Sequence, residues 1–159
     1  TFEPNERSNH QSTDKKVTIY RATQNREVTA LVFQTQTEQG YNGKIELLVA
    51  VNNNRQVQGV RVLSHLETPG LGDKIELAKS DWILDFNQQQ VQSATDSNWF
   101  VKKDGGLFDQ FTGATITPRA IVNQLRIDVS TVSQQFHVLA QLPNQCEPQK
   151  VIAETGVTP

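Results

Sequence analysis

The sequence predicts an α+β fold, in which helices pack against a largely antiparallel sheet. Two segments rich in β-branched residues, 44–52 and 56–65, are separated only by a short turn, as in an antiparallel hairpin. Residues 118–136 carry apolar side chains at every third or fourth position, as a helix with one buried face does. Strands and helices do not alternate along the chain, which argues against a parallel sheet. A chain of 159 residues suits a single domain.

Two segments before the hairpin are also rich in β-branched and aromatic residues. Residues 27–33, EVTALVF, predict a strand, and residues 15–22, KKVTIYRA, predict either a strand or a short helix. We expect a loop at residues 36–43, QTEQGYNG, because it contains two glycines. The polar residues 1–16 predict a flexible lead-in.

Beyond the hairpin, the apolar residues within 73–86, DKIELAKSDWILDF, predict a helix. Residues 98–103, NWFVKK, are a candidate strand, and residues 108–117 predict a loop. Both tryptophans, Trp82 and Trp99, lie beside apolar residues and are expected in the core.

The long helix is expected to start at Pro118, because proline suits the first helical position and Thr117 before it can act as the N-cap. Its buried face is predicted to contain Ile121, Leu125, Val129, Val132 and Phe136. The domain should therefore span residues 17–142, followed by an irregular tail at 143–159.

Composition excludes several classes of protein. The net charge is −2 and the basic residues are scattered, so we expect no nucleic-acid partner. A single cysteine, Cys146, cannot form an internal disulfide, and the three histidines are far apart in sequence, so no metal site is expected. The longest apolar run, residues 46–51, has the length of a strand and not of a membrane span.

Motifs of familiar catalytic sites are incomplete. His65-x-Glu67 matches part of a zinc-deaminase signature, but the paired cysteines that this site needs are missing. Gly70-x-Gly72 lacks the third glycine of a dinucleotide-binding loop, and no G-x-S-x-G or H-E-x-x-H motif occurs. The sequence therefore predicts no catalytic residue of its own.

The junction between the loop and the long helix, residues 112–118, is the strongest remaining candidate site. A helix N-terminus presents unpaired N–H groups and a partial positive charge, which favour an anion such as phosphate. Gly113 and Ala114 allow close approach, and Thr112, Thr115 and Thr117 offer hydroxyl groups that can bond phosphate or be esterified. Threonine-rich loops also serve simply as helix caps, and that interpretation stays open here.

Two strings together are more specific than either alone: ETPGLGDKIE from Glu67, and WFVKKDGGLFDQFTGATITPRAIV about forty residues on. From about residue 27 to residue 138 the chain resembles the FMN-binding domain family and, within it, the G subunits of Rnf electron-transport complexes. The resemblance implies that D-x-x-T-G-A-T at Asp109–Thr115 is a flavinylation motif. In the family, a flavin transferase moves FMN from FAD onto the last threonine, here Thr115, and Asp109 would be part of what it recognises.

The resemblance also implies which residues contact the cofactor. The phosphate and ribityl chain would lie against Thr112, Gly113, Ala114, Ile116 and Thr117. The flavin would lie close to Glu67, Thr68, Pro69, Gly70 and Leu71, with Pro69 and Leu71 packed on its ring. Since the flavin supplies the redox chemistry, the missing acids and bases are explained.

The implied function is electron transfer by covalent FMN in an ion-translocating oxidoreductase of the Rnf type, without independent turnover. Partners would be the other subunits of this complex and the flavin transferase. The chain starts at Thr1, so we expect an N-terminal membrane anchor to have been removed, and a position on the periplasmic side of the inner membrane. Two alternatives stay open: the C subunit of a sodium-pumping NADH:quinone oxidoreductase, or a module that binds a phosphate-bearing ligand reversibly.

Overall fold

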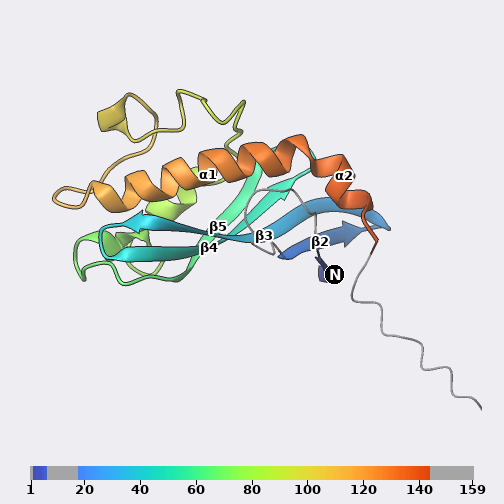
Figure 1. Ribbon diagram of the computed structural model, residues 1–159, viewed down its shortest axis with the longest axis horizontal. Coiled ribbons are helices and arrows are strands. Elements are labelled where there is room, and N and C mark those ends of the chain that lie inside the picture. Colours follow the sequence, from blue (N-terminus) through green and yellow to red (C-terminus); the bar gives the residue numbers. More distant parts are fainter. Residues whose placement is uncertain (1, 7–17, 144–159) are drawn as a thin grey trace, which may run out of the picture.

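The computed structural model describes residues 2–6 and 18–143. Five antiparallel strands form one sheet in the order β1-β2-β3-β4-β5. Their bounds are β1 Phe2–Glu6, β2 Thr18–Gln24, β3 Glu27–Gly40, β4 Gly43–Asn52 and β5 Val57–Ser64. Helix α1, Ile116–Gln134, crosses one face of this sheet, and the shorter α2, Phe136–Gln141, follows it (Figure 1). The predicted α+β class with an antiparallel sheet is therefore confirmed.

The core lies between the sheet and α1. Alternate residues of β4 (Ile45, Leu47, Val49 and Val51) are fully buried, which places one face of this strand against the helix side. The predicted apolar face of α1 is confirmed, since Ile121, Leu125, Val129, Val132 and Phe136 are each at most 9% exposed. The expected hairpin is also confirmed, with Val49 opposite Val60 in the antiparallel pair of β4 and β5.

Strand β3 is longer than the sequence indicated. The loop expected at residues 36–43 is reduced to a turn at Tyr41 and Asn42, because Gln36 and Thr37 still pair with Glu46 and Ile45 of β4. The segment at 15–22, whose type was left open, is a strand from Thr18 onward. Residues 2–6 of the expected lead-in form β1, which pairs with β2. The rest of the lead-in, and the tail beyond residue 143, lie outside the described residues.

The prediction of one helix at residues 73–86 was wrong. Two short 3₁₀ helices, η1 Gly72–Ile75 and η2 Asp81–Phe86, are separated by extended backbone at Ser80. The Ser80 hydroxyl accepts the N–H of Trp82 at 3.2 Å, so this side chain caps a new helix where a continuous one would have passed. The apolar spacing reflects burial of Ile75, Trp82, Ile83 and Phe86 from two separate turns.

The candidate strand at residues 98–103 was also wrong. Only Val101 forms a bridge, with Phe108, and a third 3₁₀ helix, η3 Lys102–Asp104, follows at once. The apolar residues of this segment instead fill an aromatic cluster, in which Trp99 lies 5.1 Å from Phe108 and 5.7 Å from Phe86 between ring centroids. Both tryptophans are buried, as predicted.

Candidate functional site

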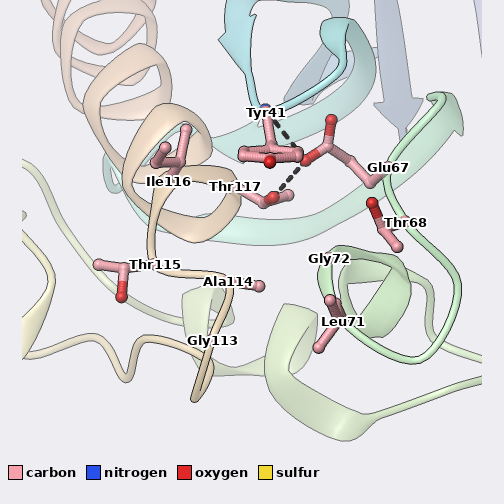
Figure 2. A pocket seen from close by; sticks show the side chains of 10 residues that line it. All are labelled: Tyr41, Glu67, Thr68, Leu71, Gly72, Gly113, Ala114, Thr115, Ile116 and Thr117. Carbon is pink, nitrogen blue, oxygen red and sulfur yellow. Dashed lines mark hydrogen bonds between the residues drawn. The ribbon is translucent and has the colours of Figure 1, made fainter.

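A cavity of about 300 Å³ lies where the first turn of α1 meets two other segments. These are the β3–β4 turn and the loop that follows β5. Figure 2 shows the side chains that line it, and they come from all three segments. The lining residues are Tyr41, Glu67, Thr68, Leu71, Gly72, Gly113, Ala114, Thr115, Ile116 and Thr117.

The β3–β4 turn brings Tyr41 to the cavity. Gly40 pairs with Gly43, so Tyr41 and Asn42 form the tip of the hairpin. Gly43, directly after the turn, has a φ of +97°, a left-handed conformation that glycine adopts without strain. The side chain of Tyr41 is 67% exposed.

Glu67 joins all three segments through its carboxylate, although it is only 4% exposed. The backbone N–H groups of Tyr41 and Asn42 donate to this carboxylate at 3.1 and 2.9 Å. The hydroxyl of Thr117, in the first turn of α1, donates to the same group. Figure 2 shows the bonds from Tyr41 and Thr117 as dashed lines. Three donors satisfy the buried charge, as a buried carboxylate requires.

Two glycines leave room for this carboxylate. A Cβ atom on Gly72 would lie 2.7 Å from the Thr117 hydroxyl and 2.9 Å from the Glu67 Cβ. A Cβ atom on Gly40 would lie 2.9 Å from the Glu67 carboxylate. The close approach of the three segments therefore depends on small residues at both positions.

A tight turn delivers the chain to α1. The N–H of Ala114 donates to the carbonyl of Phe111 at 3.1 Å, and Gly113 between them has a φ of +75°. A four-residue turn with this dihedral at its third position is of type II, which requires glycine there. The motif T-G-A-T thus places Thr115 directly at the start of the helix.

Thr115 is the N-cap residue of α1, but its side chain makes no capping hydrogen bond. The predicted N-cap, Thr117, was wrong: its hydroxyl is committed to Glu67, and the helix starts two residues earlier than Pro118. Among the described residues, none hydrogen-bonds the Thr115 hydroxyl, and Figure 2 shows its side chain directed away from Glu67. An accessible hydroxyl therefore lies beside the unpaired N–H groups of a helix N-terminus.

Two residues, Trp82 and Lys102, hold the segment before Thr115 through contacts with Asp109. The indole N–H of Trp82 donates to the carbonyl of Asp109 at 2.8 Å. Lys102 Nζ lies 2.6 Å from the Asp109 carboxylate, and this hydrogen bond raises the pKa of Lys102. Asp109 itself is exposed and does not line the cavity, so a partner protein can reach its side chain.

A second contact fixes the other side of α1. Arg119 donates two hydrogen bonds to Asp104, at 2.6 and 3.0 Å, which lowers the pKa of that carboxylate. The paired guanidinium holds η3 against the first turn of the helix.

The imidazole ring of His65 makes hydrogen bonds that hold the loop after β5. Its Nδ1 accepts the N–H of Glu67 at 2.9 Å, and its Nε2 lies 2.7 Å from the Glu76 carboxylate. A ring nitrogen that accepts carries no proton, so Nε2 bears the hydrogen and donates it to Glu76. This ring therefore helps to position the backbone of Glu67.

Most of the predicted site residues come together around the cavity. Those that line it are Glu67, Thr68, Leu71, Gly113, Ala114, Thr115, Ile116 and Thr117. Thr112, Pro69 and Gly70 belong to the same two loops but are not among the lining residues. Sequence reasoning missed Tyr41, and the only signal for it was the GYNG turn. The part that each residue plays toward FMN stays a prediction.

Within residues 2–6 and 18–143, no group of three or more His, Cys, Asp or Glu side chains is arranged to hold a metal ion. In that same part of the chain, no helix has both the length and the apolar character needed to cross a membrane.

The sequence of this fold matches a flavin-binding class of domain. Residues 40–127 match the FMN-binding domain family, and the chain belongs to that family. It is 51% identical over 137 residues to the G subunit of the ion-translocating oxidoreductase complex of Vibrio cholerae, which covers 86% of the chain and 66% of that relative. The protein of the same name from Pseudoalteromonas atlantica is 50% identical over 131 residues, covering 82% of the chain and 61% of the relative.

A third relative of this name, from Pasteurella multocida, is 59% identical over 105 residues, or 66% of the chain and 52% of the relative. The chain thus spans about half to two thirds of the length of the relatives that it matches. The predicted resemblance to the G subunits of ion-translocating complexes is confirmed.

Proposed function

We propose that this domain carries FMN in an ion-translocating oxidoreductase complex of the Rnf type, with the FMN phosphate esterified to Thr115. One observation carries this proposal above others. In a member of the FMN-binding domain family, the Thr115 hydroxyl is accessible, without a described partner, at the N-terminus of a 19-residue helix beside a cavity.

The residues present fit a phosphate at this position. The first N–H groups of α1 have no partner within the helix and attract an anion. Gly113 presents backbone without a side chain, and its missing Cβ would have only Leu71 within 4 Å, at 3.8 Å. The carboxylate of Glu67 is engaged by its three donors, and Figure 2 shows the Thr115 side chain directed away from it.

The cavity also suits an aromatic ring system. Leu71 and Ile116 are 41% and 45% exposed at its edge, which is a large exposure for aliphatic side chains. A bound flavin supplies the redox chemistry, and the protein binds and orients it. This division of roles accounts for a lining that contains no histidine, lysine or cysteine and one carboxylate, Glu67, whose oxygens are already engaged.

Attachment by a separate flavin transferase is part of the proposal. The Thr115 oxygen forms a bond to the FMN phosphorus of FAD, the pyrophosphate bond breaks, AMP leaves and the hydroxyl proton is released. Threonine is a weak nucleophile without an adjacent base. Since no described side chain bonds the Thr115 hydroxyl, the base must come from the transferase, which the exposed Asp109 would help to dock.

The relatives are subunits of a complex, so the partners proposed here are its other subunits. We further propose that the domain lies on the periplasmic side of the inner membrane and is held there by a preceding N-terminal helix. Electrons would pass through the flavin without turnover of a free substrate.

The test is the intact mass of the denatured domain, produced in the periplasm with and without a co-expressed flavin transferase. The proposal expects an added mass equal to esterified FMN, lost in Thr115→Val and kept in Thr131→Val. The second variant is the control, because Thr131 is an exposed threonine of α1 that lies outside the T-G-A-T motif and does not line the cavity. If yellow colour appears without added mass, the domain binds FMN reversibly and the covalent proposal fails.

A further inference from the structure

Tyr41 is the most exposed of the large hydrophobic residues that line the cavity, and the proposed attachment at Thr115 does not explain its position. It is 67% exposed, although an aromatic ring is normally at least partly buried. Figure 2 shows the ring edge-on at one side of the cavity, with Ala114 and Leu71 at the opposite side. The cavity thus has an aromatic side chain at one side and aliphatic side chains at the other.

The backbone of Tyr41 is held firmly even though its side chain is exposed. The Glu67 carboxylate binds the N–H groups of Tyr41 and Asn42, and the Asn42 amide donates to the Leu66 carbonyl at 2.8 Å and to the Thr68 hydroxyl at 3.2 Å. Four hydrogen bonds therefore fix the hairpin tip to the loop that carries Leu71. Because Thr117 also binds Glu67, the tip is fixed to α1 as well.

This arrangement sets the backbone of Tyr41, from which the ring extends, at a constant place relative to the first turn of α1. The hairpin tip and the first turn of α1 are distant in sequence, and one buried carboxylate connects them. A rigid aromatic ring beside an attachment point can pack on a planar ligand at little cost in conformational entropy, since tyrosine has few rotatable bonds.

We propose that Tyr41 packs its ring against the flavin that Thr115 carries, opposite Leu71, and that Glu67 is the residue that positions it. This inference rests on the proposed function. Tyr41 would then shield one face of the flavin from water and quench its emission, because contact with an electron-rich aromatic ring quenches flavin fluorescence.

The experiment compares Tyr41→Leu, Tyr41→Trp and Tyr20→Leu with the unchanged domain, each produced with the flavin transferase. Tyr20 is the chain's other tyrosine, lies on β2 and does not line the cavity, so its change is a matched control. Intact mass gives the ester content of each protein. Flavin fluorescence per ester, and its further quenching by iodide, are then measured.

We expect higher emission and greater access to iodide in Tyr41→Leu, and values close to those of the unchanged domain in Tyr41→Trp and Tyr20→Leu. Esterified protein whose emission and iodide access are unchanged in Tyr41→Leu would overturn the inference and leave the proposed function standing. A missing ester in the unchanged domain would overturn both. Thermal unfolding of each protein before the comparison excludes a loss of fold as the cause of any change.

Discussion

The hydroxyl of Thr117 donates a hydrogen bond to the carboxylate of Glu67, 50 residues earlier, and both side chains are buried. This contact joins the loop after β5 to the first turn of α1. It also explains why Thr117 does not cap the helix, and so why Thr115 takes the N-cap position with an uncommitted hydroxyl. The geometry around Thr115 thus depends on a pair of residues that form no hydrogen bond with the Thr115 side chain.

Thr117→Val should destabilise the domain, because valine keeps the shape of threonine but leaves the carboxylate with one donor fewer. Hydrogen bonds to charged groups contribute about 1.5–3 kcal/mol, and we expect a loss of that size in the free energy of unfolding. Urea denaturation measures it. The control is Thr131→Val, an exposed threonine of the same helix whose hydroxyl bonds only the Ile127 carbonyl. If both changes lowered the free energy of unfolding equally, the hydrogen bond from Thr117 to Glu67 would make no special contribution to stability.

Gly72→Ala should be destabilising, because the added Cβ would lie 2.7 Å from the Thr117 hydroxyl and 2.9 Å from the Glu67 Cβ. Forcing one extra carbon into a packed site costs roughly 1–3 kcal/mol. Gly59→Ala is the comparison, since a Cβ there has no neighbour within 4 Å and the position lies inside β5. Thermal melting of both variants would refute this prediction if Gly72→Ala were as stable as Gly59→Ala.

Asp85 should make stability depend on pH. Partial burial raises the pKa of this carboxyl, and the nearby Asp109 and Asp81 raise it further, against the opposing effect of Lys102. A raised pKa in the folded state means that folding favours the protonated form, so stability falls as pH rises through this pKa. Asp85→Asn should therefore be more stable than the unchanged domain at pH 7.

This gain should vanish as pH falls below the ordinary range of aspartate, where both folded and unfolded chains are protonated at residue 85. Urea denaturation across a series of pH values gives the profile. Glu27→Gln, which removes an exposed carboxylate at the start of β3, is the control. If the free energies of unfolding of Asp85→Asn and the unchanged domain differed by the same amount at all pH values, Asp85 would not be the source of the pH dependence.

The parts of the fold that are regular along the sequence could be predicted from it. The β4–β5 hairpin follows from alternating apolar residues and a short turn, and the buried face of α1 follows from its periodicity. The 73–86 segment could not, because its apolar residues fill the core from two separate 3₁₀ turns and only resemble a helical face. Short apolar segments are ambiguous in this way when tertiary contacts decide their shape.

The residues of the site also differ in whether the sequence could predict them. T-G-A-T and the Glu67–Leu71 loop could be found because each is a local string. Tyr41 could not, because its place depends on the register that puts Gly40 opposite Gly43, and on the capture of two backbone N–H groups by Glu67. Sequence alone does not pair a hairpin tip with a carboxylate 26 residues later.

Gly113→Ala and Gly70→Ala together separate backbone strain from a role in the site. Both glycines have a positive φ, +75° and +77°, which costs an alanine about 1–2 kcal/mol. We expect similar losses of stability in the two variants.

Of these two glycines, only Gly113 lines the cavity, and its new Cβ would lie 3.8 Å from Leu71, in the space proposed for the cofactor. The ester content by intact mass should therefore fall in Gly113→Ala and stay unchanged in Gly70→Ala, although both are equally strained. Equal ester contents would show that the cofactor does not need the open backbone at Gly113, and a loss in Gly70→Ala alone would move the contact to the loop after β5.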